Sequence, residues 1–408
     1  MIKIPKHKYI DKNKKLNIPQ EHFNYIKGYL FNLINLYINC CDIVKNEKIS
    51  ITKNVDNLNM NIINGCLAVI TNKTYKELGK FKSKEDILKG SINNEFKYNI
   101  NKIKEILVEL IDDESEIYIE KIIKYKPKEL INIYNIFIQK CKNIKEKSVN
   151  IVSKENIIEE SVFKNILNKI FNYDKFIDSG FNIDNTTKTS YRRWSAYEYC
   201  EKLNVNVCPY CNRIYTYTVI QKYCEKENIT RPELDHYFPK SKYPIFALSF
   251  FNLIPSCNIC NSTIKGINEL NINKNLHPYL DELDDGYKFD YDVKGISTFE
   301  GDKSSIKIKI YKGKLDDKSN NTLKFFKIEQ IYQKHTDTVA NLILLRRKYT
   351  DGVLQEITDL INNNGNGLLS KEELFNDLFH EFNENEIVDT SLGKLKKDIT
   401  NKLRINNK

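Results

Sequence analysis

The chain has 408 residues, with 64 Lys and Arg against 54 Asp and Glu, which gives a formal net charge of +10. This length is sufficient for a full hydrophobic core and for two or three domains. No apolar stretch is long enough for a transmembrane helix, and charged residues interrupt the start where an export signal needs an apolar run. We therefore expect a cytoplasmic protein with no membrane partner. In that reducing environment, paired cysteines indicate a metal site more often than disulfides.

Residues 1–185 are predicted to form a helical domain. Apolar residues recur at three- and four-residue spacing from Phe23 to Tyr37, from Ile103 to Leu110 and from Leu130 to Cys141. We interpret these stripes as core faces and not as binding surfaces. The Asp-Ser-Gly turn at 178–180 and the Asn and Asp residues after it indicate a linker. A helix is expected from about Ser190 to Leu203, and it would include Trp194, the single tryptophan of the chain.

Two Cys-x-x-Cys pairs follow, the first at Cys208 and Cys211 and the second at Cys257 and Cys260. Each pair bends the backbone so that both sulfurs can face one tetrahedral ion. The four cysteines are therefore predicted to bind one structural zinc ion.

Between the two pairs lies a short predicted strand that carries Asp235 and His236. Consecutive strand residues point to opposite faces unless the strand ends there, and Pro239 indicates that it does end. The Asp235 carboxylate can ligate a hard cation, and a neutral His236 imidazole can take a proton from water. These are two of the groups that hydrolysis of a phosphodiester requires.

Four further residues complete the predicted site. Asn252 can hold the imidazole of His236 in one tautomer. The second cysteine pair begins a short helix on which Asn261 and Lys265, four residues apart, share a face. Asn261 can offer an amide oxygen to the cation, and Lys265 can neutralise a phosphate oxygen. His277 is a possible further metal ligand, although a turn histidine before proline is the simpler interpretation.

After residue 285 the pattern changes. Polar and apolar residues alternate over 287–293 and 306–310, which predicts a β-hairpin, and helical spacing returns from Leu323 to Tyr349 and in two further helices. Asparagines from Asn362 onwards, with Glu373, imitate the spacing of a calcium loop, but only one carboxylate is present and an Asn-rich turn explains them better. We predict an α+β protein with domains at 1–185, 186–285 and 286–408.

The order Cys-x-x-Cys, Asp-His, Asn, Cys-x-x-Cys-Asn, Lys resembles that of zinc-knuckle HNH endonucleases over roughly residues 190 to 285. The resemblance implies a ββα-metal fold, in which the Asp-His strand, a second strand and a helix surround the catalytic centre. It makes His236 the general base and Asn252 the central motif residue. It makes Asp235 and Asn261 the ligands of a catalytic Mg²⁺ or Mn²⁺ ion, since hard oxygen donors prefer such metals. Asn261 replaces the third motif histidine, as in the HNH domain of RNA-guided CRISPR nucleases.

Within the same span the chain also looks like the HNH subunits of Septu-type and retron-associated phage-defence systems. Those subunits act together with an ATPase. This likeness implies a DNA endonuclease of antiviral defence with a partner ATPase. Two alternatives stay open: a zinc-stabilised nucleic-acid-binding module without cleavage, and a ribonuclease that acts on RNA such as tRNA.

The charge of the predicted nuclease segment bears on its partners. Between Tyr191 and Asp285, eleven Lys and Arg residues are balanced by eleven Asp and Glu residues. Because neutralisation of phosphates supplies most non-specific DNA affinity, we expect this segment alone to bind duplex DNA poorly. The charge that binds DNA must come from the flanking regions, from bound metal or from another protein.

Overall fold

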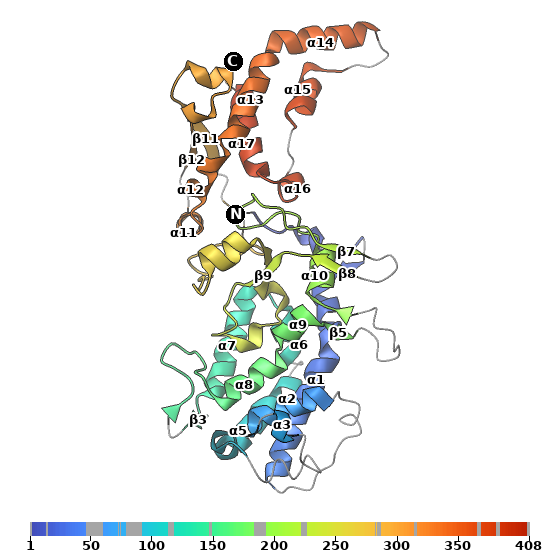
Figure 1. Ribbon diagram of the computed structural model, residues 1–408, viewed down its shortest axis with the longest axis vertical. Coiled ribbons are helices and arrows are strands. Elements are labelled where there is room, and N and C mark those ends of the chain that lie inside the picture. Colours follow the sequence, from blue (N-terminus) through green and yellow to red (C-terminus); the bar gives the residue numbers. More distant parts are fainter. Residues whose placement is uncertain are drawn as a thin grey trace.

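The computed structural model describes residues 2–13, 15–45, 60–71, 73, 75–78, 92–112, 118–146, 149–182, 193–221, 227–281, 283, 287–313, 316–364, 369–380 and 384–405. Helices make up most of the described chain, and its strands pair into six two-stranded antiparallel sheets. The predicted α+β class is confirmed. The view in Figure 1 is elongated, with the N-terminal helices at one end and the C-terminal helices at the other.

The N-terminal region is helical, as predicted. It contains β1 (Ile10–Asp11), β2 (Leu16–Asn17), α1 (Ile18–Val44), α2 (Met60–Ile70), α3 (Tyr75–Leu78), α5 (Asn94–Ile111), α6 (Tyr118–Lys124), α7 (Pro127–Cys141), β3 (Lys145–Glu146), β4 (Val149–Asn150), α8 (Val162–Ile170) and α9 (Tyr173–Asp178).

Helix α1 organises this region. Asn17 caps it by accepting a hydrogen bond from the backbone N–H of Gln20, which satisfies a donor that a helix start otherwise leaves unpaired. Its buried residues, Phe23, Ile26 and Leu30 among them, recur at three- and four-residue spacing. This stripe packs against α5, α6 and α10, and each fully buried apolar side chain contributes about 1.5–3 kcal/mol.

The helix predicted from Ser190 begins later. Trp194 lies in strand β6 (Arg193–Trp194), opposite Phe181 of β5 (Phe181–Asn182), and helix α10 (Ala196–Leu203) follows. Ser195 and Glu198 form a capping box at the start of α10. Such a box fixes the first helical turn and leaves Ser195 itself extended, so the residue before it is free to pair as a strand.

The central region consists of short strands. It contains β7 (Val219–Gln221), β8 (Glu227–Thr230), β9 (Glu233–His236), β10 (Leu253–Ser256) and the short helix η5 (Ile259–Lys265), which has π-type hydrogen bonding.

The C-terminal region begins with the predicted hairpin, β11 (Tyr287–Val293) and β12 (Ile306–Lys312), paired along their whole length. The helical stretch predicted from Leu323 to Tyr349 contains several helices, and Lys327, which has a left-handed backbone (φ 53°), lies at the first break. The helices of this region are α11 (Asp317–Phe325), α12 (Ile328–Tyr332), α13 (Thr336–Lys348), α14 (Asp351–Asn364), α15 (Lys371–Phe379), α16 (Glu384–Ile387) and α17 (Gly393–Ile405).

The described parts of the calcium-like segment are the end of α14 and the residues that lead into α15. The Asn362 side chain bonds to the backbone N–H and carbonyl of Leu369, and the Glu373 carboxylate caps α15 with Ser370. Residues 365–368 of this segment lie outside the described residues. The Asn-rich interpretation accounts for both described side chains without an ion.

One buried hydrophobic cluster extends from Ile4 to Leu403, so all three predicted regions share a core. A second, small cluster of Leu354, Phe375 and Phe379 lies between α14 and α15, which project at one end in Figure 1. The predicted boundaries at 185 and 285 both lie outside the described residues and stay predictions. No described helix is both long enough and apolar enough to cross a bilayer.

Candidate metal centre and active site

The predicted site is built on the hairpin of β9 and β10. The two strands are antiparallel, with Ile254 opposite Asp235 and Leu253 opposite His236. The loop between them runs through residues 237–252. Helix η5 follows β10 almost directly and packs against β9, so two strands and a short helix surround the predicted catalytic residues.

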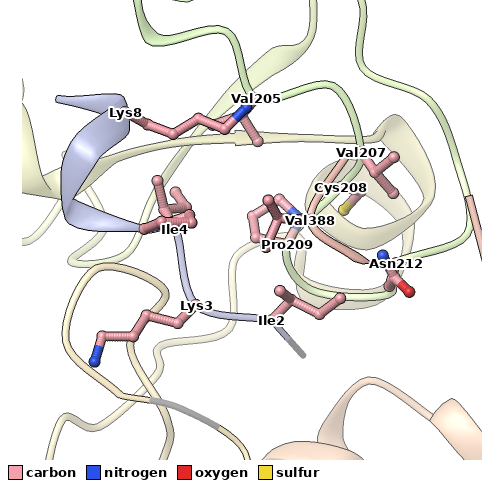
Figure 2. A pocket seen from close by; sticks show the side chains of 11 residues that line it. Ile2, Lys3, Ile4, Lys8, Val205, Val207, Cys208, Pro209, Asn212 and Val388 are labelled. Carbon is pink, nitrogen blue, oxygen red and sulfur yellow. The ribbon is translucent and has the colours of Figure 1, made fainter. Parts of the chain in front are cut away.

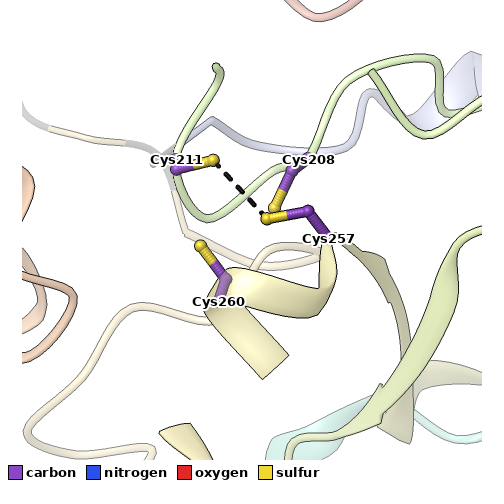
Figure 3. A group of neighbouring side chains, drawn as sticks. All are labelled: Cys208, Cys211, Cys257 and Cys260. Carbon is purple, nitrogen blue, oxygen red and sulfur yellow. Dashed lines mark hydrogen bonds between the residues drawn. The ribbon is translucent and has the colours of Figure 1, made fainter. Parts of the chain in front are cut away.

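The four predicted zinc cysteines converge. The sulfurs of Cys208, Cys211, Cys257 and Cys260 all lie within 4.8 Å of one another, and all four residues are buried. The Cys211 and Cys257 sulfurs are 3.9 Å apart. Figure 3 shows the first pair in a loop and the second at the start of η5. Four thiolates at this spacing repel one another unless a cation lies between them, so the cluster can hold a metal ion such as zinc.

The loop of the first cysteine pair is also a junction. The N-terminal segment before β1 reaches it, because the backbone N–H of Ile2 donates to the carbonyl of Pro209 over 2.7 Å. A small, mainly apolar pocket lies on this side of the loop, and Figure 2 shows Ile4, Pro209 and Val388 among its lining side chains. The pocket carries none of the predicted catalytic residues.

Asp235 and Lys265 form a buried ion pair. The Lys265 ammonium donates to Asp235 Oδ1 and to the backbone carbonyl of His236, both at 2.8 Å, and the two side chains are 3% and 2% exposed. The Tyr210 hydroxyl donates to Asp235 Oδ2 over 2.6 Å. Burial raises the pKa of Asp235, and these two partners oppose that rise. The prediction that Lys265 meets a substrate phosphate is wrong in this structure, because its ammonium is buried and already paired.

His236 lies on the other side of β9 from Asp235. Its Nε2 is 3.0 Å from the carbonyl of Ala247, and because a carbonyl only accepts, Nε2 must carry the proton. Its ring packs edge-on against Tyr173, with ring centres 4.4 Å apart. Nδ1 is therefore the unprotonated nitrogen, and no described donor reaches it. Burial lowers the pKa of His236 to about 4, so the imidazole is neutral at neutral pH.

Asn252 does not hold the imidazole, contrary to prediction. Its amide accepts from the backbone N–H of Phe238 at 2.7 Å and donates to the carbonyls of Phe238 and Phe246. A fully buried amide must satisfy both ends, and here the backbone of the loop does so. Asn252 thus shapes the loop whose Ala247 carbonyl holds His236, and its effect on the imidazole is indirect.

Asn261 lies beside Glu233, which is not among the site residues predicted from the sequence. Its Nδ2 donates to the Glu233 carboxylate over 2.9 Å, and Asn258 and Ser262 donate to the same carboxylate at 2.7 Å. Burial alone would raise the pKa of Glu233, but these three hydrogen bonds outweigh it and hold the pKa below its usual value. Glu233 precedes Asp235 by two residues and shares its face of β9, which is the sequence signal that could have identified it.

His277 is a buried turn residue. Its ring packs on Tyr237 with centres 4.2 Å apart, and its Nδ1 accepts from the backbone N–H of Tyr279. Among the described residues, the one group of His, Cys, Asp and Glu side chains whose donor atoms gather as a metal site is the four cysteines. His277 is outside it, and the turn interpretation fits the structure.

A hard cation fits the remaining donors in part. Each oxygen of Asp235 accepts one described hydrogen bond, and a carboxylate oxygen has capacity for a second contact. The Asn261 amide oxygen has no described donor. However, the Lys265 ammonium already neutralises Asp235, so a divalent ion there would share the carboxylate with it. Binding of Mg²⁺ or Mn²⁺ by Asp235 and Asn261 stays a prediction.

Comparison of the chain with protein-family models, with curated proteins and with solved structures finds no match.

Proposed function

We propose that the protein is a metal-dependent endonuclease of the HNH type that hydrolyses phosphodiester bonds in DNA. The observation that carries the proposal is the union of a β9–β10 hairpin, a helix that follows it directly and a four-cysteine cluster. This union agrees with the motif order that suggested the family from the sequence. At the end of β9, the same arrangement contains His236, whose imidazole is neutral and is oriented by a hydrogen bond to the Ala247 carbonyl.

His236 would act as the general base. The Ala247 carbonyl fixes the tautomer and leaves Nδ1 to take a proton from the attacking water. The catalytic Mg²⁺ or Mn²⁺, held by Asp235 and Asn261, would supply charge stabilisation of the scissile phosphate and leaving oxygen. Lys265 would contribute indirectly, because it bonds to both Asp235 and the backbone of His236 and so fixes their relative position.

The test is cleavage by the full-length, zinc-loaded protein and its His236→Asn variant. Plasmid DNA and total RNA are incubated separately, with and without added Mg²⁺. Asparagine places an amide near the position of the imidazole Nδ1, but this amide cannot accept the proton of water. We expect wild type to cut DNA only with Mg²⁺, and the variant to be at least about 100-fold slower, the range for loss of a general base.

The matched control is His7→Asn, at an exposed histidine far along the chain from β9. It should cut at the wild-type rate, and both variants should retain zinc. Cleavage of RNA but not DNA would favour the ribonuclease alternative. Binding without cleavage of either would favour the nucleic-acid-binding module, and a His236→Asn variant as fast as wild type would contradict the base assignment.

The proposal extends to partners. The segment from Tyr191 to Asp285 has no net charge, whereas the whole chain has +10, so contacts with DNA phosphates are assigned mainly to the flanking regions or to a partner. The motif resemblance to the Septu-type and retron-associated subunits suggests which partner this is. By that resemblance, it is an ATPase of an antiviral defence system.

A further inference from the structure

The face of β9 that meets η5 carries two carboxylates, and only Asp235 has a role in the proposal above. Glu233 receives three hydrogen bonds from the start of η5: from Asn258 Nδ2 on Oε1 at 2.7 Å, and on Oε2 from Asn261 Nδ2 at 2.9 Å and Ser262 Oγ at 2.7 Å. Of these three donors, Asn261 alone is a predicted cation ligand. Glu233 therefore contacts the site through the side chain of that residue.

The chemistry of the contact fixes which way the Asn261 amide points. An ionised carboxylate only accepts hydrogen bonds, so the group that faces Glu233 must be the NH₂ of the amide. The amide oxygen is then turned away from Glu233, and no described donor reaches it. Without this partner the amide could rotate by half a turn, and its NH₂, which cannot ligate a cation, would take the place of the oxygen.

We propose that Glu233 is a positioning residue of the active site, which orients the Asn261 amide so that its oxygen is presented to a divalent cation. The proposal rests on the proposed function for the identity of the cation site. Partners that orient a metal ligand commonly change metal affinity by about 10- to 100-fold when they are removed.

Two other roles for Glu233 give different expectations. As a direct metal ligand it would depend on its negative charge, and an uncharged glutamine would not replace it. As a purely structural brace of η5 it would affect stability and leave the affinity of the folded protein for the cation unchanged. As a positioning residue it needs only an acceptor oxygen beside Asn261, which glutamine retains.

The experiment measures Mn²⁺ binding to the full-length, zinc-loaded protein by electron paramagnetic resonance. The variants are Glu233→Ala, Glu233→Gln, Asn261→Ala and the double Ala variant. Ser262→Ala is the matched control, because it removes a hydrogen bond from the same carboxylate oxygen and leaves Asn261 intact. Zinc content and melting temperature are measured for each.

We expect Glu233→Ala to weaken Mn²⁺ binding by about 10-fold or more, and Glu233→Gln and Ser262→Ala to stay within about threefold of wild type. The double variant should bind Mn²⁺ as Asn261→Ala does, because Glu233 acts through Asn261. Equal losses in Glu233→Gln and Glu233→Ala, or a further loss in the double variant, would overturn the positioning role in favour of direct ligation. Unchanged affinity in Glu233→Ala would also overturn it.

Cleavage assays on the same samples separate this inference from the proposed function. Wild type that binds Mn²⁺ and cuts DNA, with Glu233→Ala equal to it in both, refutes the positioning role alone. The expected order of Mn²⁺ affinities without any cleavage refutes the nuclease and leaves the positioning role standing. Wild type that binds no Mn²⁺ refutes the positioning role directly, because no cation is then presented with the amide oxygen.

Discussion

His22 of α1 is fully buried, and both of its ring nitrogens are hydrogen bonded. Nε2 donates to the carbonyl of Leu248, and Nδ1 accepts from the indole N–H of Trp194, each at 2.8 Å. An indole N–H can only donate, so Nδ1 must be unprotonated. Burial lowers the pKa of His22 to about 4, and the residue joins α1, β6 and the loop before β10.

This environment predicts a stability loss in acid. The folded pKa lies below the unfolded value of 6.5, so the contribution of His22 is complete above pH 6.5 and is lost as the pH falls towards 4. Between pH 7 and pH 4.5 the loss should be roughly 2–3 kcal/mol. Urea denaturation at the two pH values measures it, with wild type compared to His22→Gln.

Glutamine can offer an acceptor to Trp194 and a donor to Leu248, but it does not titrate. The variant should therefore lose less stability than wild type over the same pH interval, whatever its stability at pH 7. An identical decline in both proteins would show that the acid loss comes from other groups, such as the partly buried His236 and the buried His277.

At the level of helices and strands, the two cysteine pairs bring together two segments that are distant in the sequence. Cys208 and Cys211 lie in a loop after α10, whereas Cys257 and Cys260 lie after β10 and within η5. An ion bound by all four would fix η5 against that loop, and with it Asn261 and Lys265. Because metal-binding free energy at such a site is largely folding free energy, the cluster should contribute strongly to stability.

We therefore expect Cys257→Ser to reduce zinc below one ion per chain after dialysis and to lower the free energy of unfolding by several kcal/mol. Cys200→Ser is the matched control, since Cys200 is buried in α10 outside the cluster. It should keep full zinc and lose only about 1–2 kcal/mol for the buried hydroxyl. Elemental analysis and urea denaturation check both, and folded wild type without zinc would contradict the assignment.

On the scale of the whole molecule, Asn212 connects the cysteine loop to the C-terminal region. Its side chain donates to the carbonyl of Ile387 at 2.9 Å and accepts from the backbone N–H of Lys394 at 3.0 Å. Its own carbonyl accepts from Leu392. Asn212 is 2% exposed and has a left-handed backbone, with φ 51°, a conformation that asparagine tolerates better than most residues.

Asn212→Gly should therefore loosen the C-terminal region. Glycine adopts the same backbone at little cost, so the loss of the side-chain bonds is isolated, and leaving buried backbone groups unpaired costs about 1–3 kcal/mol each. Asn204→Gly is the matched control, because Asn204 has a similar φ of 47° but is exposed. Urea denaturation and limited proteolysis should show destabilisation for Asn212→Gly alone. Equal stability of the two variants would exclude this connection.

The features that depend on local spacing could be predicted from the residues alone. The 3.6-residue period gave the N-terminal helices, alternation gave β11 and β12, and the two Cys-x-x-Cys pairs gave the sulfur cluster, because two short motifs constrain where four donors can point. The order of Asp235, His236 and Asn261 indicated a strand and a helix that the structure contains.

The groups that these side chains contact could not be predicted in the same way, because they depend on the fold. Lys265 pairs with Asp235, because a buried carboxylate without a countercharge is strongly destabilising, whereas a solvated lysine is stable without a phosphate partner. Asn252 bonds to the backbone of its own loop, and the His236 imidazole bonds to the backbone carbonyl of Ala247. A pattern of side chains along the sequence could not predict a partner that belongs to the backbone. Spacing along a chain predicts the face of an element on which a side chain lies. Its hydrogen-bond partner depends on all the buried polar groups that the fold brings within reach, because each of them must be hydrogen bonded.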